Sequence, residues 1–215
     1  MTIPTFQSLI VNRHARIGIV GDLDSASEIW LILHGYGMLA QGILHWFRAA
    51  ARPGRVLVAP EALSRFYVEF QGTRRVGASW MTREARDEDL ADLLPYLTQV
   101  VTPLRAACAR LEVHGFSQGV AAGARLLVHA PLEVDRLVCW GGTVPLDVDP
   151  IQLVSRVAGG TIDYVVGARD TRTPRGTVLA DAERMRAGGA PVRVHEFDGG
   201  HRIDDRVLAD LDALG

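Results

Sequence analysis

The chain has 215 residues, a formal net charge of −2, a pI near 6.4 and 48% hydrophobic residues. This balance excludes the strongly basic surface of a nucleic-acid-binding protein and is typical of an ordinary globular domain. No apolar run approaches the roughly 18 residues of a membrane span, and we expect no signal peptide at the N-terminus. Cys108 and Cys139 stand in apolar stretches, which favours buried free thiols over a disulfide. We therefore expect a cytoplasmic protein that folds as one domain over residues 1–215.

Short apolar runs and longer amphipathic stretches alternate along the chain. After one or two leading strands within residues 6–20, the runs predict strands at 29–33, 55–59, 111–114, 136–140, 161–166 and 192–197. Their hydrophobicity is nearly continuous, which favours a parallel sheet covered on both faces, and residues 6–20 could add an antiparallel edge pair.

The stretches between the strands predict helices at 41–51, 83–101, 118–129, 173–187 and 204–214. Pro95 lies inside the second of these, so we expect a kink or break near Leu94. Strand–helix–strand order throughout the chain predicts an α/β fold with right-handed crossovers.

Residues 115–119 read Gly-Phe-Ser-Gln-Gly, between a predicted strand and a predicted helix. A G-x-S-x-G sequence in this setting is typical of a nucleophile elbow, in which small residues on either side of a strained serine prevent collision. The serine then stands at a helix N-terminus, where the helix dipole favours negative charge. Ser117 is therefore the candidate nucleophile.

A serine hydroxyl needs a positioned base, and in proteins with this elbow the acid and the histidine follow the serine in the chain. Asp170 and His201 each follow a predicted strand, at the sheet edge where ligands bind in open α/β folds. Of the seven histidines, only His201 lies on a Gly-Gly loop after the last strand. Asp147 remains an alternative acid, whereas Asp198 is expected to shape the loop of His201.

Two amides are needed to hold the charged oxygen that forms during attack on a carbonyl. One should come from Gln118, the residue after the nucleophile. The other should come from the loop after the first buried strand, which reads His34-Gly35-Tyr36-Gly37. We expect the Tyr36 amide to be this second donor, and His34 to bond loop backbone rather than act as a base.

With these residues in place, the chain resembles the phospholipase/carboxylesterase family, which includes acyl-protein thioesterases. The matching segments are Leu33–Gly37, Val58–Pro60, Ser79-Trp80, Gly115–Gly119, Gly167–Asp170 and Gly200-His201. The resemblance implies an α/β-hydrolase fold with a mostly parallel central sheet, helices on both faces and little or no cap. It also implies hydrolysis of small-molecule esters or thioesters without a cofactor or metal.

The sequence therefore predicts a serine carboxylesterase with the triad Ser117, Asp170 and His201 and short-to-medium acyl substrates. Trp80, Met81 and Phe116 are candidate substrate-binding residues, and Tyr36 could join them. Acyl thioesterase or lysophospholipase activity is the alternative within enzymes, and a ligand-binding protein that keeps the triad without turnover is the alternative outside them.

Overall fold

The computed structural model describes residues 5–70, 72–157 and 159–213. Its central sheet has seven strands in the order β1-β3-β2-β6-β7-β8-β9, all parallel to their neighbours except the edge strand β1. The sheet strands are β1 (Ile17–Val20), β2 (Glu28–Leu33), β3 (Arg55–Pro60), β6 (Arg110–Phe116), β7 (Arg136–Trp140), β8 (Thr161–Gly167) and β9 (Val192–Phe197).

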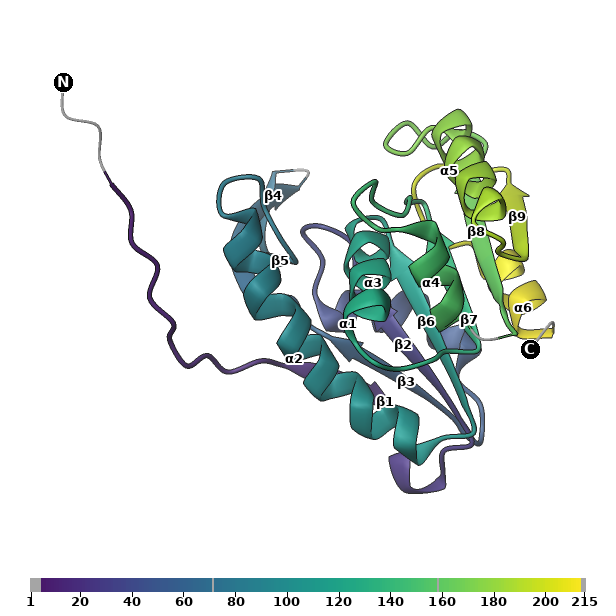
Figure 1. The fold of residues 1–215 in the computed structure, drawn as a ribbon, viewed down its shortest axis with the longest axis horizontal. Helices are drawn as coiled ribbons and strands as arrows, with labels where there is room; N and C mark the ends of the chain where they lie inside the picture. The colour runs from purple at the N-terminus through teal and green to yellow at the C-terminus, as the bar shows by residue number, and fades with distance from the viewer. Residues whose placement is uncertain (1–4, 71, 158, 214–215) are drawn as a thin grey trace.

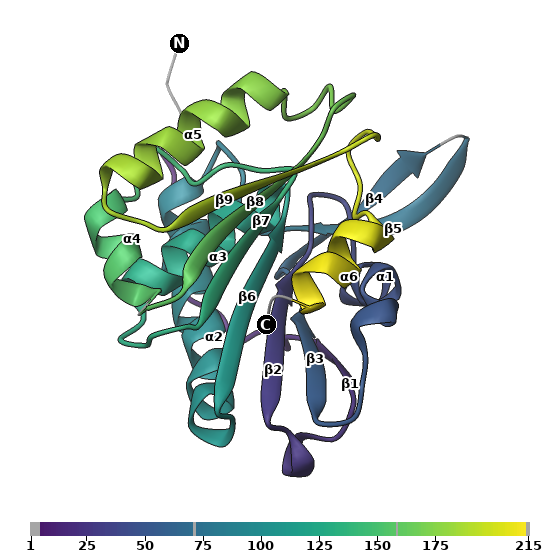
Figure 2. The ribbon, with the colours of Figure 1, turned by 90° about the vertical axis from the view of Figure 1, so that its right-hand side faces the viewer.

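Helices cover both faces of this sheet (Figures 1 and 2). One face carries α2 (Arg86–Ala107), α3 (Gln118–His129), α4 (Pro150–Arg156) and α5 (Arg175–Ala187), and the other carries α1 (Ala40–Trp46) and α6 (Asp205–Ala213). Strand β2 explains why the sequence shows no alternation, because Leu31 packs into the core under α2 and α3 while Trp30 packs on the α1 side. Residues on both faces of a covered strand must be apolar.

The N-terminal region forms one strand of the one or two predicted within residues 6–20, and this strand pairs antiparallel with β3 at the sheet edge. Only residues 17–20 join the sheet, as β1, and residues 5–16 form neither helix nor strand. Within that segment, the Ser8 hydroxyl donates to Glu88 at 3.3 Å, and the Arg16 carbonyl accepts from Glu61 N–H at 2.8 Å. Short 3₁₀ turns lie at Leu23–Ser25, between β1 and β2, and at Arg48–Ala50, between α1 and β3. Cys139 is a buried free thiol as predicted, and the free thiol of Cys108 is partly buried.

Of the kink or break predicted near Leu94, the break is wrong, because α2 runs as one element of 22 residues with Pro95 and Pro103 inside it. Each proline removes a backbone hydrogen bond. The helix is maintained by an apolar stripe packed on the sheet, formed by Leu93, Leu97, Val100, Val101 and Leu104. Tertiary packing here outweighs a local preference.

An antiparallel hairpin of β4 (Ser64–Phe70) and β5 (Thr73–Ser79) was not predicted from the sequence. It stands outside the central sheet, near the N-terminal end of α2 (Figure 1). The end of β5 returns to the core, where Ala78 and Ser79 are buried.

Within the described ranges, no helix combines the length and apolar character that a membrane span requires.

Candidate active site

Ser117 lies at the sharp turn between β6 and α3. Its backbone angles are φ 53° and ψ −115°, and among the described residues it is the one non-glycine with positive φ. The turn is possible because its neighbours are small: a Cβ at Gly115 would lie 2.6 Å from the backbone of Val120, and a Cβ at Gly119 would collide with the carbonyl of Leu33. A strained residue held by its surroundings is the geometry of a nucleophile elbow.

Asp170 and His201 meet beyond the carboxyl ends of the neighbouring strands β8 and β9. The Asp170 Oδ2 atom lies 2.7 Å from Nδ1 of His201. Its other oxygen, Oδ1, accepts backbone hydrogen bonds from Arg172 and Thr173, both at 2.9 Å. The carboxylate is buried and held at both oxygens, so it fixes the direction of the imidazole.

The Gly141–Gly142 turn lies between Ser117 and the Asp170–His201 pair. A Cβ at Gly141 would lie 3.1 Å from His201 Nδ1, and a Cβ at Gly142 would lie 2.7 Å from the carbonyl oxygen of Ser117. The ring of Phe116, next to Ser117, has its centroid 4.8 Å from that of His201. The structure thus brings the three predicted residues around one turn at the carboxyl edge of the sheet.

The two competing carboxylates bind arginines instead. Asp147 receives two hydrogen bonds from Arg125, at 2.8 and 3.1 Å, and one from Arg86 at 3.0 Å. The hydrogen bond from Arg125 holds the pKa of Asp147 below its usual range. Asp198 pairs with Arg169 on the surface. Within the described chain, His201 therefore has Asp170 as its carboxylate partner.

His34 bonds loop backbone, as predicted. The Ala62 N–H donates to its Nε2 at 3.0 Å, so Nε2 is unprotonated and Nδ1–H donates to the Gly35 carbonyl at 2.8 Å. Burial lowers the pKa of His34 to about 4. The ring is neutral near pH 7 and ties the loop to residue 62.

The two predicted amide donors are both available. In the loop after β2, Gly37 N–H donates to Ala78 O at 2.8 Å and Met38 N–H donates to Gly35 O at 3.1 Å. The Tyr36 N–H, directly before these two, and the Gln118 N–H, at the first residue of α3, have no acceptor among the described residues. Free amides at a helix start and in an adjacent loop can hold an anionic oxygen.

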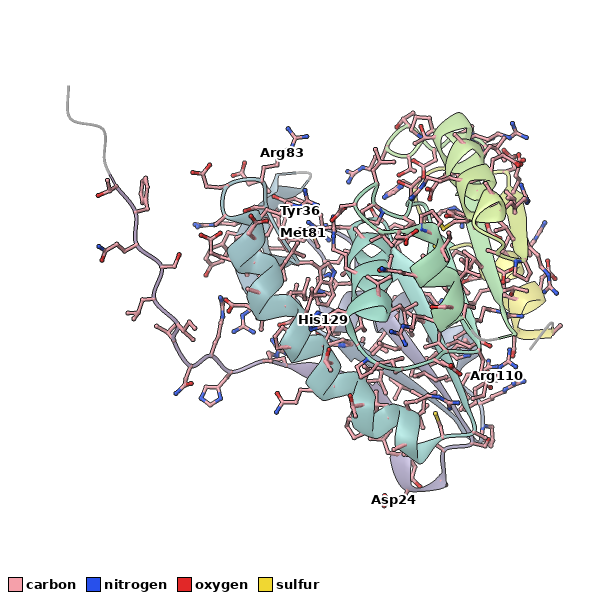
Figure 3. The ribbon with its side chains drawn as sticks, viewed as in Figure 1. Asp24, Tyr36, Met81, Arg83, Arg110 and His129 are labelled. Atoms are coloured by element: carbon pink, nitrogen blue, oxygen red, sulfur yellow. The ribbon has the colours of Figure 1, made fainter. Side chains whose placement is uncertain are left out.

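The predicted substrate-binding residues differ in what they expose. Trp80 and Phe116 are 3% and 4% exposed, so they support the site from beneath and offer little surface to a ligand. Met81 is partly buried after the end of β5, and Tyr36 is 56% exposed; both are labelled in Figure 3. Met81 and Tyr36 can contact a molecule in the site more fully than the two buried rings can.

The side chain of Gln118 makes hydrogen bonds that were not predicted from the sequence. Its Oε1 accepts from Trp80 N–H at 3.1 Å, and its Nε2 donates to Met81 O at 2.8 Å. The sequence did hold a sign of these bonds: a nucleophile elbow does not require glutamine after the serine, so the glutamine in Gly-Phe-Ser-Gln-Gly called for another explanation.

Among the described residues, no group of three histidine, cysteine or acidic side chains is placed to hold a metal ion.

No protein-family model and no curated protein matches the chain. Solved structures do: acyl-protein thioesterase 2 from Zea mays is 18% identical with a TM-score of 0.69, over 94% of this chain and 100% of that one. Carboxylesterases from Mesorhizobium loti (20% identity, 93% of each chain, TM-score 0.69) and Bacillus cereus (17%, 93% and 92%, 0.68) also match. Likeness at these identities establishes the architecture: the chain has the α/β-hydrolase fold.

Proposed function

We propose that this protein is a serine hydrolase that cleaves carboxylic esters with short-to-medium acyl groups. The single observation that carries the proposal is the hydrogen-bonded Asp170–His201 pair beside Ser117, which stands strained at a strand–helix elbow. A structural role for these residues would explain neither the positive φ of Ser117 nor the two free amides beside it.

The proposed reaction proceeds through an acyl-enzyme. Nδ1 of His201 faces Asp170, which leaves Nε2 to take the proton of Ser117 as its hydroxyl attacks the carbonyl carbon. Asp170 holds this tautomer and stabilises the imidazolium that forms. The amides of Tyr36 and Gln118 bind the oxyanion, and the alcohol leaves with the proton from His201. In the second half of the reaction, His201 takes a proton from water as the water attacks the acyl-enzyme, and then returns that proton to Ser117 as the acid is released.

An acyl group would lie against Met81 and Tyr36, above the buried rings of Trp80 and Phe116. Arg125 bonds the Met81 sulfur at 3.2 Å, which fixes the position of that side chain. Between β7 and β8, the described residues form one short helix, α4, which makes no covering domain over the site. This arrangement favours substrates whose acyl chain is not deeply enclosed.

A panel of p-nitrophenyl acetate, butyrate and octanoate tests the proposal, with Ser117→Ala as the paired variant. We expect hydrolysis by the wild type and a fall in kcat of about 10⁶ in the variant. A fluorophosphonate probe should label the wild type at Ser117 and leave Ser117→Ala unlabelled. Unimpaired hydrolysis by the variant would contradict the proposed nucleophile, and a wild type that neither labels nor hydrolyses would indicate a ligand-binding protein.

Thioesters and lysophospholipids are the second candidate substrates, because the chemistry is shared and one structural neighbour is an acyl-protein thioesterase. The same enzyme should then be assayed with a thioester of matched acyl length. A kcat/KM at least tenfold higher for the thioester would assign this protein to thioester hydrolysis. A kcat/KM higher for the oxygen ester supports the carboxylesterase proposal.

A further inference from the structure

Residues 78–81 connect the two sides of the site. Ala78 pairs with the loop after β2: its carbonyl accepts from Gly37 N–H at 2.8 Å, and its N–H donates to Met38 O at 3.0 Å. Three residues later, the Met81 carbonyl accepts from the side chain of Gln118, which begins α3. One short segment therefore contacts both elements that carry the proposed amide donors.

Trp80 makes the connection to the loop specific. Its Nε1–H donates to the carbonyl oxygen of His34 at 2.7 Å, and its ring stacks on the His34 ring with centroids 4.6 Å apart. His34 is itself fixed at both ring nitrogens, to Gly35 and Ala62. The loop is consequently held at His34 and Gly35, just before Tyr36, and again at residues 37 and 38, just after it.

Gln118 makes the connection to the elbow. Its side-chain oxygen accepts from Trp80 N–H, while its amide nitrogen donates to Met81 O and to the hydroxyl of Ser79 at 3.2 Å. These bonds hold the residue whose own backbone N–H is the other proposed donor. A continuous hydrogen-bonded path thus runs from Gln118 through Trp80 to His34, and by the chain to Tyr36.

We propose that Trp80 and the side chain of Gln118 are positioning residues that set the distance between the Tyr36 and Gln118 amides of the oxyanion hole. This inference rests on the proposed function. Donors must lie about 2.7–3.1 Å from the oxyanion, and a misplacement of about 1 Å can cost a hundredfold in rate. The path acts on the transition state, since the oxygen becomes charged only there.

The proposal separates two functions for Trp80. A residue that forms a wall of the acyl site changes substrate binding, so its replacement raises KM with kcat preserved. A positioning residue lowers kcat and leaves KM nearly constant. Because Trp80 is almost fully buried, the second outcome is the one that its surroundings favour.

The test uses Trp80→Phe, which keeps the stacked ring and removes the donor to His34. We expect kcat on p-nitrophenyl butyrate to fall about 10- to 100-fold, with KM changed by less than about threefold. The inhibition constant of a butyl boronic acid, which forms a tetrahedral adduct, should rise by the same factor as kcat/KM falls. Gln118→Ala should behave alike, and the double variant should lose less than the product of the two single losses.

Trp30→Phe is the matched control. Trp30 is also a buried indole that donates one hydrogen bond, to Glu28 at 2.9 Å, and stacks on a buried histidine, His114, with centroids 4.2 Å apart. It packs in the core on the other face of the sheet. Its replacement should lower the melting temperature as Trp80→Phe does, and leave kcat and boronate inhibition unchanged.

Three results would overturn the inference: wild-type kcat with a raised KM in Trp80→Phe, an equal loss of kcat in Trp30→Phe, or kcat and boronate affinity that do not change together. Should Gln118→Ala fail to fold, Gln118→Glu is the substitute variant. It keeps the acceptor for Trp80 N–H and loses the donor to Met81, and its kcat should lie between those of Gln118→Ala and wild type.

Ser117→Ala separates the two proposals. If it is inactive while Trp80→Phe retains full kcat, only the positioning inference fails; if it keeps wild-type activity, the proposed function fails too.

Discussion

Asp170 is the residue whose replacement tests the triad most directly. Asp170→Asn keeps the size of the side chain and replaces the acceptor facing His201 Nδ1 with a group that can donate. The imidazole is then free to adopt the wrong tautomer, with the proton on the nitrogen that should accept from Ser117. We expect kcat to fall by about 10⁴ on p-nitrophenyl butyrate, with the melting temperature as a check on folding.

Asp147→Asn and Asp198→Asn are the controls for that measurement. Both carboxylates pair with arginines and neither bonds His201, so kcat should stay within about threefold of wild type in each. A large loss of kcat in Asp147→Asn together with a small loss in Asp170→Asn would identify Asp147 as the acid of the triad instead of Asp170.

At the residue scale, the sequence could identify the candidate triad because its signals are local. Ser117 stands in a five-residue pattern, and Asp170 and His201 each follow an apolar run that ends at a glycine-containing loop. The neighbours of Trp80 were not predictable in the same way. Its burial and its bond to His34 depend on residues 46 positions apart in the chain, which no local pattern encodes.

At the element scale, the six central strands follow from apolar runs, whereas the β4–β5 hairpin does not. The hairpin lies outside the sheet and carries four exposed arginine or aromatic side chains, so its strands lack the buried apolar runs that mark the central strands. The four are Arg65, Tyr67, Arg74 and Arg75. Helix α2 shows the converse, because packing on the sheet keeps it intact through two prolines that locally predict a break.

Gly77 determines how closely the hairpin approaches the loop after β2. A Cβ at this position would lie 2.6 Å from the carbonyl carbon of Gly37, and backbone cannot rotate away as a side chain can. Gly77→Ala should therefore displace residues 35–38, lower kcat about 10- to 100-fold and cost about 1–3 kcal/mol of unfolding free energy.

Gly42→Ala is the control for Gly77→Ala. Gly42 lies inside α1 with open space where a Cβ would stand, so alanine should raise the unfolding free energy by about 0.5–1 kcal/mol and leave kcat unchanged. Urea denaturation and steady-state kinetics on the same preparations measure both effects. Unchanged kcat in Gly77→Ala would mean that the loop tolerates the shift, and that its contact with β5 does not position Tyr36.

At the scale of the whole molecule, two buried histidines make stability depend on pH. Burial lowers the pKa of both His34, to about 4, and His114, which is fully buried beside Glu112. Both rings are neutral in the folded chain at pH 7. In the unfolded chain they titrate near pH 6.5, so below that pH the unfolded state binds protons that the folded state excludes.

The unfolding free energy should therefore be highest above pH 6.5 and fall as the pH drops toward 4. Each excluded proton contributes a slope of about 1.4 kcal/mol per pH unit, and His34 alone accounts for about 3 kcal/mol between pH 6.5 and 4. Glu112 is buried, but its hydrogen bond with His114 and the nearby arginines lower its pKa to about 2. Protonation of Glu112 therefore adds a further loss of stability only below about pH 4.5.

Urea denaturation from pH 7.5 to 4.5 measures the slope. His34→Gln should reduce the slope by up to one proton. An equal slope in His34→Gln and wild type would show that His34 titrates alike in both states.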